Sequence, residues 1–133
     1  AGESPPPQVR AVVADCGYSS AWEELVHQLK RQYHLPPFPV MYLASLLYRR
    51  RMGSRFRDNS PIHQLQKATI PILFIHGAED DYVPVRMARE MFEAYQGEKE
   101  LFLVPGAYHA TSHLQSPEAY EAKVAAFLER IGF

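Results

Sequence analysis

Apolar and polar positions along the chain form blocks of two kinds. Three short runs are almost wholly apolar, and they cover 9–15, 70–76 and 99–104. The longer segments between and after them carry apolar residues every three or four positions, at 21–32, 40–52, 85–95 and 117–131. Short valine- and isoleucine-rich runs predict strands buried on both faces, whereas the longer spacing predicts amphipathic helices. Strands separated by helices predict a three-layer α/β fold with about three parallel strands, in the order βα(α)βαβα.

Length and composition indicate one globular domain covering 1–133. Of the 133 residues, 47% are hydrophobic and 22% are charged, and the formal net charge is −1. Bulk charge therefore gives no reason to expect binding to nucleic acid. No window approaches the ~18 apolar residues that a membrane span needs. The start is not typical of a signal peptide, and the single cysteine, Cys16, excludes an internal disulfide, so we expect a cytoplasmic location.

The densest positive charge lies at the end of the second predicted helix. Arg49, Arg50 and Arg51 end this helix, and Arg55 and Arg57 follow it closely. We interpret the cluster as a solvated helix end, where cations also interact favourably with the helix dipole. Binding of a polyanion or an acidic substrate is the alternative.

A polar, glycine-bearing loop follows each predicted strand. These loops begin at Asp15, Gly77 and Gly106. In an open parallel sheet, ligands bind beyond the carboxyl ends of the strands, so an acid on one loop and a histidine on the next can meet there. A carboxylate that accepts the imidazole N–H fixes the tautomer of the ring and stabilises its charged form. That pair is the back half of a nucleophile–histidine–acid triad.

Two motifs and the last helix carry a resemblance to a known family. The stretch PILFIHGAEDDYVP, followed by ELFLVPGAYHATSH and an amphipathic C-terminal helix, resembles the last third to half of the α/β-hydrolase family. The likeness covers roughly 9–133 and is strongest to bacterial serine hydrolases of the esterase and prolyl-oligopeptidase-like kind. It implies that Asp80 is the acid and His109 the base of a Ser-His-Asp triad. It also implies that 33–61 is a cap, or insertion, over the substrate pocket.

Ser19 is the one serine of this chain that lies in a context like that of the family's nucleophile. Gly17-Tyr18-Ser19-Ser20-Ala21 nearly matches the G-x-S-x-G turn between a strand and a helix. However, the family has a further strand between the nucleophile strand and the aspartate strand, and 24–69 contains no apolar run that fits it. We therefore interpret 9–15 as that intervening strand and Ser19 as a helix cap, with Ser19 as nucleophile kept as the alternative.

These observations predict the C-terminal part of a serine hydrolase that cleaves an ester, amide or thioester bond. The nucleophile would lie outside this chain, and the chain alone would be inactive. The open edge of a three-stranded sheet invites pairing, so we expect docking on the N-terminal part of the same hydrolase or self-association. No cofactor is expected, and neither Cys16 nor the histidines show the compact spacing of a metal site. The alternatives are a non-catalytic α/β interaction module and a compact hydrolase that uses Ser19.

Overall fold

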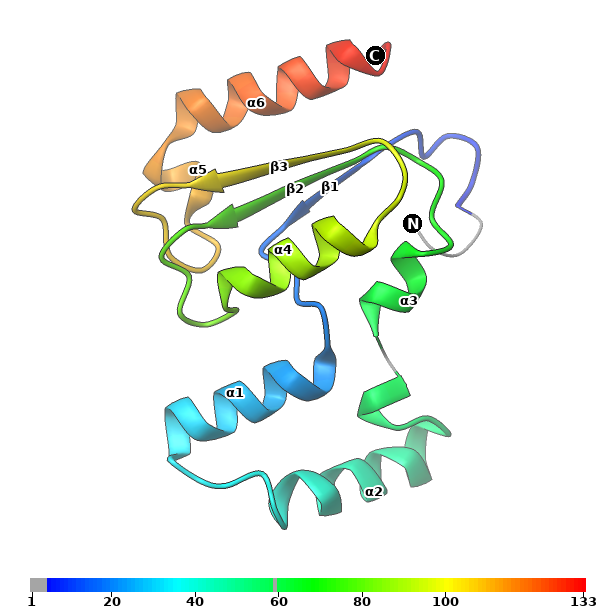
Figure 1. The fold of residues 1–133 in the computed structure, drawn as a ribbon, viewed down its shortest axis with the longest axis vertical. Coiled ribbons are helices and arrows are strands. Elements are labelled where there is room, and N and C mark those ends of the chain that lie inside the picture. The colour runs from blue at the N-terminus through cyan, green and yellow to red at the C-terminus, as the bar shows by residue number, and fades with distance from the viewer. Residues whose placement is uncertain (1–4, 59) are drawn as a thin grey trace.

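The computed structural model describes residues 5–58 and 60–133. Three parallel strands form one sheet in the order β1-β2-β3, as Figure 1 shows. The strands are β1 (Val12–Asp15), β2 (Ile72–Gly77) and β3 (Lys99–Val104). Because all three run in the same direction, their carboxyl ends meet at one edge of the sheet, called the carboxyl edge below.

Six α-helices and one 3₁₀ helix are described around the sheet. They are α1 (Ala21–Tyr33), α2 (Val40–Met52), η1 (Phe56–Asp58), α3 (Pro61–Leu65), α4 (Val85–Ala94), α5 (Ser112–Gln115) and α6 (Pro117–Arg130). The predicted parallel α/β fold is confirmed, and the predicted bounds of α2 and β3 agree with the structure. In the described residues, no helix is long and apolar enough to cross a membrane.

Several predicted bounds were wrong. The second strand, predicted at 70–76, covers Ile72–Gly77, and three helices end one residue away from the predicted position: α1 at Tyr33, α4 at Ala94 and α6 at Arg130. The first strand begins at Val12 and not at Val9, because Val12 is the first residue to pair with the neighbouring segment of the sheet. Its backbone N–H donates to the carbonyl of Pro71. Val9 instead donates its backbone N–H to the carbonyl of Pro6, in a turn. The loop predicted to begin at Gly106 ends at the short helix α5, which the sequence did not predict.

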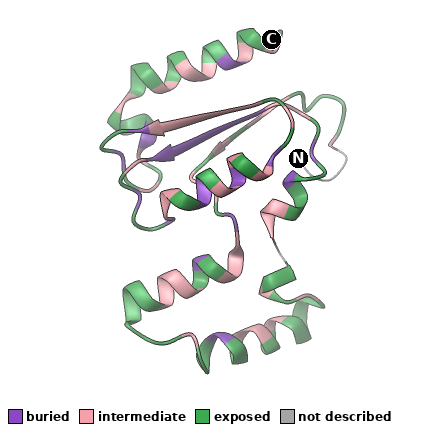
Figure 2. Ribbon diagram, viewed as in Figure 1, coloured by how far each residue is buried: buried purple, intermediate pink, exposed green. Residues whose placement is uncertain are grey.

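The central strand β2 is buried along its whole length, and helices cover both of its faces (Figure 2). One face carries Ile72 and Phe74, which pack with Leu65, Met91 and Tyr95 of the α3–α4 side. On the other face a second cluster joins the sheet to Phe127 of α6. Its other buried members are Leu73, Ile75, Val104 and Ala107. These two clusters on opposite sides of the sheet produce the three layers.

Helices α1 and α2 lie apart from the sheet (Figure 1). The apolar face predicted for α1 is not buried in a core, since Glu24 is its one buried residue and Leu25 is exposed. The reason is that α1 packs chiefly against η1 and not against the strands. On α2, Met41 is buried, whereas Leu46 and Leu47 are exposed.

Replacement of Phe127 by alanine tests the core on the α6 side. The side chain is fully buried, so Phe127→Ala should lower the free energy of unfolding by about 3–5 kcal/mol. Urea denaturation measures this change. The matched control is Leu114→Ala, whose side chain is 80% exposed and which should change stability by no more than about 0.5 kcal/mol. Equal losses for the two variants would contradict the packing described here.

Candidate active site

Asp80 lies in the tight turn that follows β2 at the carboxyl edge. Its Oδ1 accepts the backbone N–H groups of Tyr82 at 3.0 Å and Val83 at 2.8 Å. The side chain is fully buried, and a buried carboxylate needs such hydrogen bonds to offset its lost hydration. These two bonds fix the orientation of the carboxylate and leave Oδ2 directed toward other partners.

His109 is the first of those partners. Its Nδ1 lies 2.9 Å from Oδ2 of Asp80, and its side chain is 35% exposed. Because the carboxylate accepts the proton on Nδ1, Nε2 of the neutral ring is the free acceptor. The ring also lies against Tyr82, with 4.8 Å between ring centroids. The expectation that the two loops converge is therefore met in the structure: an acid and a histidine 29 positions apart are hydrogen-bonded.

Gly77 allows the two loops to approach so closely. A Cβ atom at this position would lie 2.4 Å from the carbonyl oxygen of Ala107 and 2.6 Å from that of Tyr108, too close for any other residue without a shift of backbone. The loops are tied by two backbone hydrogen bonds, from Ala78 to Val104 and from Glu79 to Ala107. The approach holds the loop that carries His109 against the turn that carries Asp80.

His76, at the end of β2, is a second histidine beside Asp80. Its Nε2 donates to the carbonyl of Val83 at 2.8 Å and lies 3.2 Å from Oδ2 of Asp80. The ring is fully buried, and Nδ1 has no hydrogen-bond partner among residues 5–58 and 60–133. This geometry fits a role in hydrogen bonding around the turn and not in proton transfer with solvent. The position of His76 at the end of the strand, directly before Gly77, had already indicated this local role from the sequence.

Cys16, just after β1, ties the third loop of the carboxyl edge to this site. Its Sγ accepts the backbone N–H of Ala110 at 3.2 Å, and its thiol donates to Asp15 at 3.1 Å. Cys16 and Ala110 have φ angles of 54° and 55°, a left-handed conformation that is unusual outside glycine. The sulfur thus holds the residue that follows His109, a contact that the sequence did not predict.

Ligand atoms of Cys16, His76 and Asp80 lie within 4.8 Å of one another, although the sequence spacing indicated no metal site. Burial, and then the hydrogen bond to Asp15, raise the pKa of the Cys16 thiol to about 11. A thiol must lose its proton to bind a metal ion well, so this shift opposes metal binding near neutral pH. Nε2 of His76 and both oxygens of Asp80 already make hydrogen bonds, and only Nδ1 of His76 has no partner among the described residues. The cluster is best described as a hydrogen-bonded support of the loops.

Ser19 is buried and is turned toward α4. Its hydroxyl donates to Oε2 of Glu90 at 2.5 Å, and its side chain is inaccessible to solvent. Either Ser19 or Ser20 could cap α1 by sequence, and the interpretation of Ser19 as the cap was wrong, because Ser20 has the extended backbone of an N-cap and accepts the N–H of Glu23 at 3.3 Å. The structure therefore brings Asp80 and His109 together, while the hydrogen bond of Ser19 connects it to a different element.

The raised pKa of Cys16 predicts slow alkylation by iodoacetamide. At pH 8 a thiol of pKa about 11 should react about a hundredfold more slowly than a thiol with the ordinary pKa of 9.0, because only the thiolate attacks. The rate should rise about tenfold per pH unit between about pH 7.5 and 9.5. The control is the chain in denaturant, whose rate should begin to level off near about pH 9. A native rate that levels off in the same range would contradict the shift.

Comparisons with known proteins agree with the fold and with the motifs. Residues 59–113 match the family model described as a serine aminopeptidase of type S33. The uncharacterized protein YqkD of Bacillus subtilis (strain 168) is 33% identical over 119 residues, which are 90% of this chain and 39% of that protein. The chain thus spans well under half of the length of this relative.

Three solved structures share the fold. The acylaminoacyl peptidase of Pyrococcus horikoshii is 16% identical with a TM-score of 0.67, over 97% of this chain and 21% of that one. The esterase Pf2001 of Pyrococcus furiosus is 20% identical with a TM-score of 0.66, over 97% of this chain and 46% of the esterase. The esterase Est2 of Thermogutta terrifontis, solved with butyrate bound, is 22% identical with a TM-score of 0.62, over 93% of this chain and 44% of Est2. These likenesses show that the chain forms a part of the α/β-hydrolase fold, and residues 59–113 match a model of hydrolases of that fold.

Proposed function

We propose that the chain is the C-terminal part of a serine hydrolase that cleaves an ester, amide or thioester bond. Asp80 and His109 supply the acid and the base of its Ser-His-Asp triad. The observation that carries this proposal is the 2.9 Å hydrogen bond from Nδ1 of His109 to the buried carboxylate of Asp80, at the edge of the sheet where ligands bind in such folds. The esterases and the peptidase that share the fold support the reaction class.

The geometry supports a separate role for each of the two side chains. Nε2 of His109 takes the proton of the attacking serine and later gives it to the leaving group. Asp80 holds the ring in the tautomer that leaves Nε2 free, and its charge stabilises the imidazolium that forms. The buried side of the pair is fixed by Tyr82 and Val83, whereas His109 is partly exposed toward the place of a substrate.

The nucleophile of the proposed enzyme lies outside this chain. Ser19 is unsuited to the role because its hydroxyl is buried and donates to Glu90. Strand β1 pairs directly with β2, the strand that leads to Asp80, which fits the position of the strand between nucleophile and aspartate in the family. This chain alone would then lack both the nucleophile and the donors of the oxyanion hole. Loss of one such donor costs about 10²–10³ in rate, so the chain alone is inactive.

The open side of β1 is the proposed docking edge for the rest of the hydrolase. In the described residues β1 pairs with β2 alone, and Val13 is 39% exposed. An unpaired strand edge of this kind pairs readily with another strand, so the N-terminal part of the same protein, or a second copy of this chain, would cover it.

Segment 33–61 forms the cap of the pocket, and its exposed apolar side chains at Phe38 and Leu47 favour an apolar substrate.

Two other functions are distinguished from this one by experiment. A compact hydrolase would use Ser19 with Asp80 and His109, and a non-catalytic module would keep the fold for interaction only. A fluorophosphonate probe reacts with an activated serine. With the whole gene product, we expect labelling at a serine outside residues 1–133. Labelling at Ser19 would favour the compact enzyme, and no labelling would favour the module.

His109→Ala tests the proposed base. In the whole gene product it should lower kcat for a p-nitrophenyl ester by about 10³-fold or more, because the nucleophile loses its general base. The matched control is His113→Ala, since His113 lies close in sequence but is exposed and contacts Glu121. Hydrolysis rates measured for both variants, with thermal unfolding to verify the fold, decide the matter. Retained activity in His109→Ala would refute the assignment.

Ser19→Ala separates a structural role from a catalytic one. We expect nearly unchanged ester hydrolysis, and a loss of about 1.5–3 kcal/mol in the free energy of unfolding because the hydrogen bond to the Glu90 carboxylate is removed. Steady-state kinetics and urea denaturation of the same variant measure the two effects. A large fall in kcat with unchanged stability would instead identify Ser19 as the nucleophile.

A further inference from the structure

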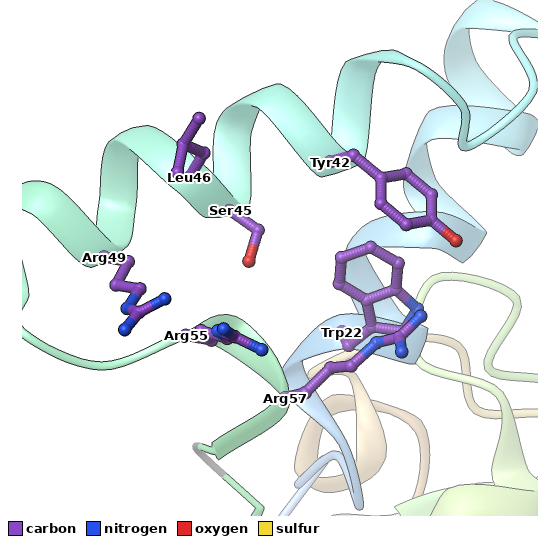
Figure 3. Close-up of a pocket in the computed structure, with 7 residues that line it drawn as sticks. All are labelled: Trp22, Tyr42, Ser45, Leu46, Arg49, Arg55 and Arg57. Carbon is purple, nitrogen blue, oxygen red and sulfur yellow. The ribbon is translucent and has the colours of Figure 1, made fainter.

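A small cavity with an unusual lining lies between α1, α2 and the segment around η1 (Figure 3). Its volume is about 230 Å³, and its lining combines aromatic and aliphatic residues with arginines: Trp22, Tyr42, Ser45, Leu46, Arg49, Arg55 and Arg57. Trp22 and Tyr42 meet edge to face, with ring centroids 5.5 Å apart. Arg57 lies over the Trp22 ring at 4.3 Å. Asp80 and His109 do not line this cavity.

The three arginines of this cavity are exposed and form no ion pair with the described residues, although Arg57 also lines a neighbouring pocket with Glu23 and Glu90. Within 5–58 and 60–133, no carboxylate lies at ion-pair distance from Arg49, Arg55 or Arg57. Arginines elsewhere in the molecule do contact carboxylates: Arg31, Arg86 and Arg130. The acid nearest in sequence, Asp58, uses its Oδ2 to accept the backbone N–H of Arg55. Positive charges gathered on one cavity repel one another, and a bound anion would remove that repulsion.

The two ends of the cavity differ in chemistry. Figure 3 shows Arg49 and Arg55 toward one end, near Ser45, and the Trp22 and Tyr42 rings toward the other, where Arg57 lies against Trp22. Guanidinium groups bind phosphate and carboxylate oxygens through paired N–H donors, and a serine hydroxyl adds a further donor. Aromatic rings provide an apolar contact surface. A ligand that fits both ends has an anionic head and an apolar body.

We propose that this cavity binds a small amphiphilic anion. Its phosphate or carboxylate head lies between Arg49 and Arg55, and its apolar chain or ring packs against Trp22 and Tyr42. The volume is below the ~300–1,000 Å³ of pockets that enclose drug-sized ligands, so the ligand is small or extends beyond the cavity. The inference goes beyond the proposed hydrolase, because none of these residues belongs to the proposed triad and binding requires no chemical step.

Calorimetric titration of the whole gene product with n-hexyl phosphate tests the site. We expect saturable binding at one site, and binding at least about tenfold weaker for inorganic phosphate and for n-hexanol, because each provides one half of the contacts. Hexanoate is a further probe: binding near that of hexyl phosphate identifies a carboxylate head, and much weaker binding identifies a phosphate head. No saturable binding of either anionic amphiphile overturns the proposal.

Matched variants locate the binding. Arg49→Gln with Arg55→Gln should weaken hexyl phosphate binding at least about tenfold. The control, Arg50→Gln with Arg51→Gln, removes the same amount of charge from the last turn of α2, outside the cavity, and it should bind as the unchanged protein does. Thermal unfolding verifies the fold. If the double variant fails to fold, Arg55→Gln alone is measured and should also bind more weakly.

Two results would overturn the site. Equal weakening in the cavity variant and in the control would mean that bulk positive charge binds the ligand. Strong binding of a polyanion such as heparin, lost equally in both variants, would instead identify the arginines as a surface for a charged polymer. Ester hydrolysis is measured separately on the same proteins. A failure of this proposal therefore leaves the triad assignment unaffected, and the reverse also holds.

Discussion

The parallel pairing of β2 with β3 is the interaction on which the candidate active site depends. The ladder runs from Ile72 opposite Lys99 to Gly77 opposite Val104, so the two strands end side by side. The loops that follow start from adjacent backbone positions, and the missing Cβ of Gly77 lets them touch. A register shift of one residue would turn the buried side chains of β2 to the opposite face and separate the two loops. The burial of the whole β2 strand opposes such a shift.

The two members of the pair are held very differently. Asp80 is buried and has the backbone N–H groups of Tyr82 and Val83 and two histidine rings around it. His109 has Asp80 on one side and partial exposure on the other. This asymmetry fixes the carboxylate and leaves the imidazole partly accessible, which the proposed role of His109 as a base requires. The contact from Cys16 to Ala110 adds a link from β1 to the same loop.

The sequence predicted what depends on local pattern and missed what depends on tertiary contacts. Helix α2 was placed correctly because proline precedes it and Gly53 ends it in the left-handed conformation. The strand end at Val104 was placed correctly for a similar reason, since Pro105 follows. Two motifs were enough to predict that Asp80 and His109 meet. The start of β1, by contrast, is set by its neighbour Pro71, and no local signal at residues 9–11 reveals it.

Side-chain partners were the least predictable feature. Ser19 and Ser20 are chemically alike, and the choice of cap was decided by Glu90 on α4, 71 positions from Ser19. The cavity lined by arginines depends on how α1, α2 and η1 lie together, an arrangement that the spacing of apolar residues does not encode. From the sequence, these arginines were interpreted as a solvated helix end, and binding of a polyanion or an acidic substrate was only the alternative.

A crystal structure of the whole gene product after reaction with a fluorophosphonate tests the central claim most directly. We expect the phosphonylated side chain to be a serine outside residues 1–133, with its oxygen within about 2.6–3.2 Å of Nε2 of His109, and with Nδ1 of His109 still bonded to Asp80. A labelled serine far from His109, or a His109 ring turned away from Asp80, would contradict the proposed triad.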